Sequence, residues 1–120
     1  MTKENLKRVL EELAAQYTNA SRLDEGGKTL VKVPAVYFPD GCTPASATAL
    51  IVLDESQPAP QLFLRTVPTL PNGKTPRSLN TATFAGESWH GFSFSQAWDE
   101  HSHTAVQFVE GRLRRFALSE

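Results

Sequence analysis

Residues 47–53 read Ala-Thr-Ala-Leu-Ile-Val-Leu, a run of apolar residues interrupted by one threonine. Branched aliphatic residues in a short run that is bounded by turn signals are typical of a strand buried inside a sheet. The turn signals are Phe38-Pro39-Asp40-Gly41 before the run and Gln57 to Pro60 after it. The stretch therefore predicts a central β-strand, around which the rest of the fold is arranged.

Shorter strands are predicted on both sides of this central strand. Before it, Val31, Val33, Ala35 and Tyr37 alternate with other residues, and Pro34, which has no N–H, favours an edge strand or a bulge. After it, residues 61–67 form a third short strand. Two stretches are predicted to lack regular structure: the polar residues 19–28, which contain Gly26-Gly27, and the proline-containing residues 68–83.

Helices are predicted at both ends of the chain. Residues 3–17 carry an apolar stripe at helical spacing, with Thr2 as a plausible N-cap, and the pattern returns from about Ser102. The cluster Arg112-Leu113-Arg114-Arg115 is predicted to be a solvated helix end, where its positive charges interact favourably with the helix dipole. The order predicts an α+β fold, an antiparallel sheet with helices packed on it. One shared core is expected, made of Leu6, Leu10, Leu13, Leu50, Val52, Leu62, Leu64, Val109 and Leu113.

Length and charge restrict the class of protein. A chain of 120 residues predicts one domain that spans residues 1–120. A net charge of −1 argues against nucleic acid or an acidic membrane as the partner, since both require a basic surface. The sequence has no apolar run that could span a membrane and begins without a signal peptide. Cys42 is the only cysteine, so no intramolecular disulfide can form, and a reduced, cytoplasmic protein is predicted.

Few residues outside the aromatic segment suggest chemistry. Cys42 has no neighbour in sequence that would stabilise a thiolate, so it is interpreted as an incidental small residue. His101 and His103 point to different sides if they lie on a helix, and His90 is the only other histidine. A solvated helix start is therefore favoured over a metal site, and neither a metal nor a cofactor is predicted.

Aromatic residues are concentrated between Phe84 and Trp98, where Trp89, Phe92 and Phe94 also lie. Taken alone, such a segment indicates a core seam more often than a binding site. The long stretch before it and this segment together are predicted to carry the functional surface, because long loops inside small domains are usually functional. Ser93 lies within the segment and would need a general base nearby to act as a nucleophile.

A wider pattern includes this segment. Leu70-Pro71-Asn72-Gly73-Lys74-Thr75-Pro76 is followed by Phe84-x-Gly86-x-x-Trp89-x-x-Phe92-Ser93 and Trp98, and then by a helix that ends in Arg112-Leu113. With this pattern the chain resembles a bacterial relative of the ubiquitin-conjugating enzymes, the prokaryotic ubiquitin-conjugating family E. The resemblance implies a short ubiquitin-conjugating (UBC-like) fold: an N-terminal helix, an antiparallel meander, an active-site loop and a C-terminal helix.

The resemblance also implies a role in a bacterial ubiquitin-like modification pathway, with a ubiquitin-like protein and an adenylating activating enzyme as partners. Two features depart from the pattern: no cysteine lies between Arg65 and Trp98, and Phe94-Ser95 stands where a basic residue and a histidine are usual. One hypothesis is a carrier that accepts the ubiquitin-like protein on Ser93 as an oxyester, with His90 as the base. The other is a catalytically silent binding module, and an unrelated small α+β domain is a third.

Overall fold

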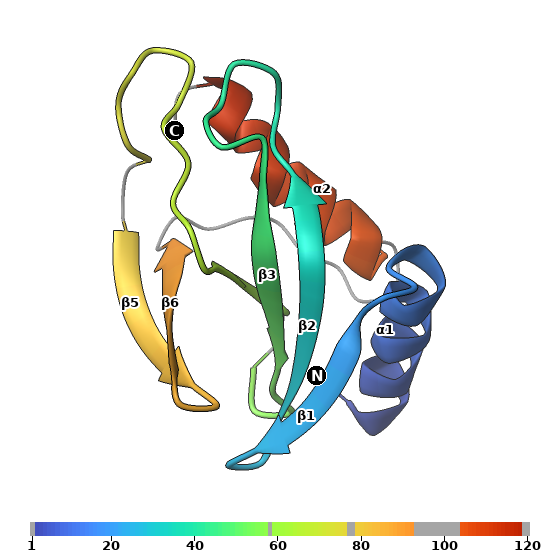
Figure 1. The fold of residues 1–120 in the computed structure, drawn as a ribbon. Coiled ribbons are helices and arrows are strands. Elements are labelled where there is room, and N and C mark those ends of the chain that lie inside the picture. The colour runs from blue at the N-terminus through green and yellow to red at the C-terminus, as the bar shows by residue number, and fades with distance from the viewer. Residues whose placement is uncertain (1, 58, 77–78, 93–103, 119–120) are drawn as a thin grey trace.

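The computed structural model describes residues 2–57, 59–76, 79–92 and 104–118 (Figure 1). Helix α1 comes first, six strands follow, and helix α2 with a short 3-10 turn, η1, ends the described chain. The bounds are α1 (Lys3–Gln16), β1 (Ser21–Glu25), β2 (Lys28–Tyr37), β3 (Ser46–Leu53), β4 (Gln61–Leu64), β5 (Leu79–Phe84), β6 (Glu87–Phe92), α2 (Ala105–Arg114) and η1 (Arg115–Leu118). The predicted α+β arrangement with a helix near each end is confirmed.

All six strands belong to one antiparallel sheet with the order β1-β2-β3-β4-β6-β5. The first four strands form a meander, and β3 lies between β2 and β4, so the predicted central strand is inside the sheet. The β5–β6 hairpin is joined to this meander through β6, where His90 is in register with Leu64 of β4.

Both helices pack on the same face of the sheet, to the right of β2 and β3 in Figure 1. Val9 and Leu13 of α1 are fully buried there, together with Val109 of α2. The amide of Ala105 at the start of α2 donates a hydrogen bond of 3.4 Å to Glu12 Oε1 of α1. The first core therefore combines the two apolar helix stripes with one side of the sheet.

The other face of the sheet has a second core, so the expectation of a single shared core is wrong for Leu50 and Val52. Successive side chains of a strand project to opposite faces, and β3 therefore sends Ile51 to the helices and Leu50 and Val52 away from them. The buried residues of this second core are Leu30, Leu50, Val52, Phe63 and Trp89, with Ala82 and Phe84 packed against them.

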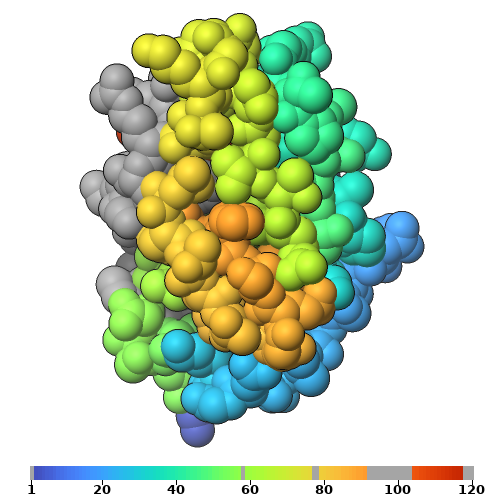
Figure 2. Space-filling model, turned by 60° about the vertical axis from the view of Figure 1, so that its left-hand side comes forward, coloured from blue at the N-terminus to red at the C-terminus, as the bar shows by residue number. Residues whose placement is uncertain are grey.

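The sheet is curled around this second core, so that the β5–β6 turn reaches the β1 edge. The amide of Ala85 in the turn donates to Glu25 Oε2 at 2.8 Å, and Lys32 Nζ lies 3.3 Å from Glu87 Oε1. In Figure 2 the hairpin, in orange, lies directly against the light-blue segment that contains β1. Strands from the two ends of the sheet therefore enclose Trp89 and its neighbours.

Two predicted loops contain strands. Residues 19–28 include β1, which turns into β2 through Gly26 and Gly27, both at positive φ (57° and 80°), and residues 68–83 include most of β5. All five residues of β1 are exposed, and so are most of those of β5, so neither segment shows the apolar alternation that predicts a strand. Pro34 predicted an edge strand or a bulge, and the register shift between Val33 and Val36 confirms the bulge.

The prediction of a solvated end for α2 is correct for Arg114 and wrong for Arg112. Arg114 is exposed, whereas Arg112 is only 6% exposed. Arg112 is one of two buried polar residues among those described. Burial, followed by the charge of Arg115, lowers the pKa of Arg112 to about 10. The third arginine, Arg115, begins η1 and is half-buried.

Candidate functional site

Two residues were predicted for a serine-based site, and of these His90 lies within the described residues. It lies on β6, is half-buried, and is in register with Leu64 on one side and Thr81 on the other. Ser93 lies outside the described residues, as do Trp98, His101 and His103. The geometry between His90 and Ser93 that a carrier mechanism requires therefore stays a prediction.

Trp89, the neighbour of His90, belongs to the second core. Its ring is 1% exposed, and its Nε1 has no hydrogen-bond partner among the described residues. Phe84 packs edge-on against Phe63 of the same cluster, with ring centroids 5.1 Å apart. For these two members of the aromatic segment, the interpretation as a core seam is confirmed.

A group of charged side chains fastens the hairpin to the meander above Trp89. Glu87 of β6 lies between Lys32 of β2 and Arg65 after β4, with Arg65 Nε 3.7 Å from Glu87 Oε2. Arg65 also donates to the carbonyl of Ser88, and its guanidinium lies 5.5 Å from the centroid of the Trp89 ring. Each of these charges is partly exposed, so the ion pairs contribute at most about 1 kcal/mol each and act chiefly in positioning.

Cys42 is buried in the first core, in the segment between β2 and β3. Burial raises the pKa of its thiol, whereas a catalytic cysteine needs a stabilised thiolate.

Among the residues that the structure describes, no group of histidine, cysteine, aspartate and glutamate could hold a metal ion. No helix in this part of the chain is long and apolar enough to cross a bilayer.

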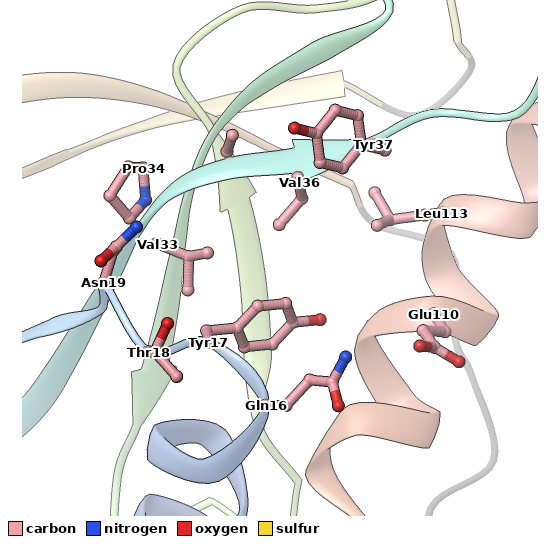
Figure 3. Close-up of a pocket in the computed structure, with 11 residues that line it drawn as sticks. Gln16, Tyr17, Thr18, Asn19, Val33, Pro34, Val36, Tyr37, Glu110 and Leu113 are labelled. Carbon is pink, nitrogen blue, oxygen red and sulfur yellow. The ribbon is translucent and has the colours of Figure 1, made fainter.

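A cleft of about 450 Å³ lies where the end of α1, the end of β2 and α2 meet (Figure 3). We call it the β2–α2 cleft. An adjoining hollow of about 330 Å³ shares Tyr37, Glu110 and Leu113 with it and adds Arg114. The lining residues of the cleft itself are Gln16, Tyr17, Thr18, Asn19, Val33, Pro34, Ala35, Val36, Tyr37, Glu110 and Leu113.

Tyr17 crosses the floor of the β2–α2 cleft. Its ring extends from the end of α1 toward α2, with the hydroxyl on the side of Leu113 and Glu110 (Figure 3). Burial, and after it the charge of Glu110, raises the pKa of Tyr17, so the phenol is neutral at physiological pH. Glu110 is the one charged side chain among the described residues that line this cleft, so the lining itself carries a single negative charge.

One wall of the cleft is the end of β2 that has no neighbouring strand on its outer side. Among the described strands, β1 pairs with β2 only from Lys28 to Lys32. The amide of Phe38 donates to the carbonyl of Ala45 at 2.9 Å, which marks these residues as a hydrogen-bonded pair. Because such pairs alternate along an antiparallel ladder, the N–H and C=O of Tyr37 point away from β3, toward the outer edge.

The sequence did not predict this cleft. Its lining combines the end of α1, the bulged half of β2 and one turn of α2, three segments that only the folded chain brings together. Pro34 was a partial signal, because a proline inside a strand predicts an edge or a bulge. Tyr17 and Glu110 gave no separate signal, since each also fits an amphipathic helix.

Comparison of the chain with protein-family models, with curated proteins and with solved structures found no match.

Proposed function

We propose that the chain is a UBC-like binding module that holds a ubiquitin-like protein or its activating enzyme without forming a covalent intermediate. The observation that carries this proposal is the burial of Cys42, the only cysteine of the sequence. A thioester carrier needs an accessible, low-pKa thiol, whereas burial here raises the pKa of the thiol. A role in binding is compatible with such a cysteine and needs no nucleophile.

The residues that carry the family resemblance support a shared scaffold. Leu70 is buried and begins a turn. In this turn the amide of Leu70 donates a hydrogen bond of 2.8 Å to the carbonyl of Lys74, and Gly73 has a positive φ. Gly86 completes the β5–β6 turn, and Trp89 fills the second core. These motif residues have structural roles in turns and core, which favours a common framework more than a common reaction.

The carrier hypothesis is the second candidate, and the position of His90 favours it. His90 is half-buried near the end of β6, two residues before Phe92, and Ser93 follows that strand directly in sequence. A serine hydroxyl has a much higher pKa than a thiol, so it needs such a base to attack an activated C-terminus.

The test first establishes whether genes for a ubiquitin-like protein and an adenylating enzyme lie beside this gene, and then combines those two proteins with the chain and ATP. The binding-module proposal predicts a complex in size-exclusion chromatography and no covalent adduct in intact-mass spectra. The Cys42→Ala variant is expected to bind as well as the wild type. An adduct that survives thiol reductant, is cleaved by hydroxylamine and is absent in Ser93→Ala would establish the carrier instead. The absence of both a complex and an adduct would reject the proposed role in this pathway.

A further inference from the structure

We infer that the β2–α2 cleft binds an extended peptide segment, which lies along the free end of β2 and directs a lysine or arginine side chain toward Glu110. This inference goes beyond the proposed pathway and does not depend on it. It rests on three observations: an open strand edge, a hollow beside that edge, and a single negative charge in the lining.

The open edge sets the conformation of the ligand. The N–H and C=O of Tyr37 point away from β3, and no described strand pairs with this end of β2 on its outer side. A peptide that adds to a sheet edge gains main-chain hydrogen bonds and places alternate side chains on the two faces. The ligand is therefore an extended segment whose side chains alternate between the cleft and the solvent.

The bulge limits how far such a peptide can pair. Pro34 has no N–H, and its carbonyl already accepts a hydrogen bond of 3.0 Å from Thr48 Oγ1. Neither Pro34 nor Ala35 has a register partner on β3. Backbone pairing is therefore confined to the neighbourhood of Tyr37, and this short contact leaves most of the selectivity to the side chain that enters the cleft.

The composition of the cleft selects a basic side chain. Val33, Val36 and Leu113 form apolar walls along which the methylene stem of a lysine or arginine can lie. At the end of this path are the Glu110 carboxylate and the neutral Tyr17 hydroxyl, both acceptors for a cationic group. Arg114 lines the adjoining hollow and not the cleft, so the lining of the cleft offers a bound cation one charge, that of Glu110.

Capped pentapeptides provide the probe: acetyl-Val-Thr-Lys-Thr-Val-amide, its norleucine counterpart and its glutamate counterpart. In ¹⁵N-HSQC titrations the lysine peptide is expected to shift the amides of Ala35, Tyr37 and Glu110. The norleucine peptide should bind about two- to fivefold more weakly, the effect of a partly exposed ion pair, and the glutamate peptide more weakly still. N-methylation is introduced in turn at the amide of the central lysine and at those of its neighbours. The peptide that is methylated at the one amide that pairs with Tyr37 should not bind.

Charge variants separate this site from general attraction between opposite charges. Glu110→Gln should weaken the lysine peptide about two- to fivefold and leave the norleucine peptide unchanged. Arg114→Gln removes a nearby positive charge and should strengthen binding slightly, whereas Glu11→Gln, an exposed carboxylate of α1 outside the cleft, should have no effect. Near-ultraviolet circular dichroism checks that each variant is folded.

Three results would overturn the inference. Equal binding of the lysine and glutamate peptides would remove the role of Glu110. No shift at Ala35 and Tyr37 at millimolar peptide would remove the site. A mass that rises with protein concentration in sedimentation, with shifts of the same amides, would assign the edge of β2 to a second copy of this chain.

Discussion

At the level of single residues, Gly91 is the described glycine at which an added Cβ atom would lie closest to its neighbours. A Cβ atom there would lie 2.6 Å from Asn80 Oδ1 and 2.7 Å from Phe63 Cε1, closer than real Cβ atoms approach. We expect Gly91→Ala to lower the free energy of unfolding by about 1–3 kcal/mol, the usual cost of overpacking, as measured by urea denaturation. Ser88→Ala, at an exposed position of the same strand, should change it by less than about 0.5 kcal/mol.

Tyr17 is expected to titrate above its ordinary pKa of 10.0, because burial and then Glu110 disfavour the phenolate. The neutral phenol stabilises the fold fully below pH 10, and this contribution is lost as the pH rises through the higher folded-state pKa. The difference in ultraviolet phenolate absorbance between the wild type and Tyr17→Phe isolates this titration. Glu110→Gln should lower the pKa only in part, since burial is the larger cause. A midpoint at or below 10 would contradict the placement of Tyr17 in the cleft.

At the level of elements, the β5–β6 turn carries local strain. Ala85 has φ 51° and Gly86 has φ 76°, the two positive values of a tight hairpin turn that favours Asn-Gly. We expect Ala85→Asn to raise the free energy of unfolding by about 0.5–1 kcal/mol, because asparagine tolerates this conformation better. The β-branched variant Ala85→Val should instead lower the free energy of unfolding. Thermal denaturation of both variants compares them directly.

Helix α2 begins with a capping box. Thr104 Oγ1 accepts from the Gln107 amide at 3.1 Å, and Gln107 Oε1 accepts from the Thr104 amide at 2.9 Å. Thr104→Ala should lower the free energy of unfolding by about 1 kcal/mol, whereas Thr104→Ser, which keeps the hydroxyl, should lose much less. A loss in the serine variant as large as in the alanine variant would exclude the cap as the cause.

The elements that the sequence predicted are those with an apolar period. The stripe of α1, its cap at Thr2 and the apolar run of β3 each give a local signal that the fold preserves. Strand β1 has no buried face, so only its turn residues, Gly26 and Gly27, could have revealed it. The cleft could not be predicted in this way, because Tyr17, Tyr37 and Glu110 meet only through the tertiary packing of separate elements.

At the level of the whole molecule, Trp89 connects the hairpin to the meander. Its ring is buried among residues of β2, β3 and β4, which belong to the same second core. Trp89→Ala should lower the free energy of unfolding by about 3–5 kcal/mol, because it leaves a large cavity, and Trp89→Phe should lose less. Urea unfolding followed by far-ultraviolet circular dichroism measures both. A cost below about 1 kcal/mol for the alanine variant would mean that the hairpin and the meander do not depend on a common core.

The junction between the hairpin and the meander has a consequence for local stability. β4 and β6 are in register only at Leu64 and His90, whereas β5 and β6 are in register from end to end. Proteins open locally in cooperative units that often coincide with supersecondary motifs such as a hairpin. The β5–β6 hairpin therefore qualifies as one such unit, and its amides should exchange with deuterium faster than those of β3. Each opening would bring the ring of Trp89 into contact with water while both helices remain folded on the other face.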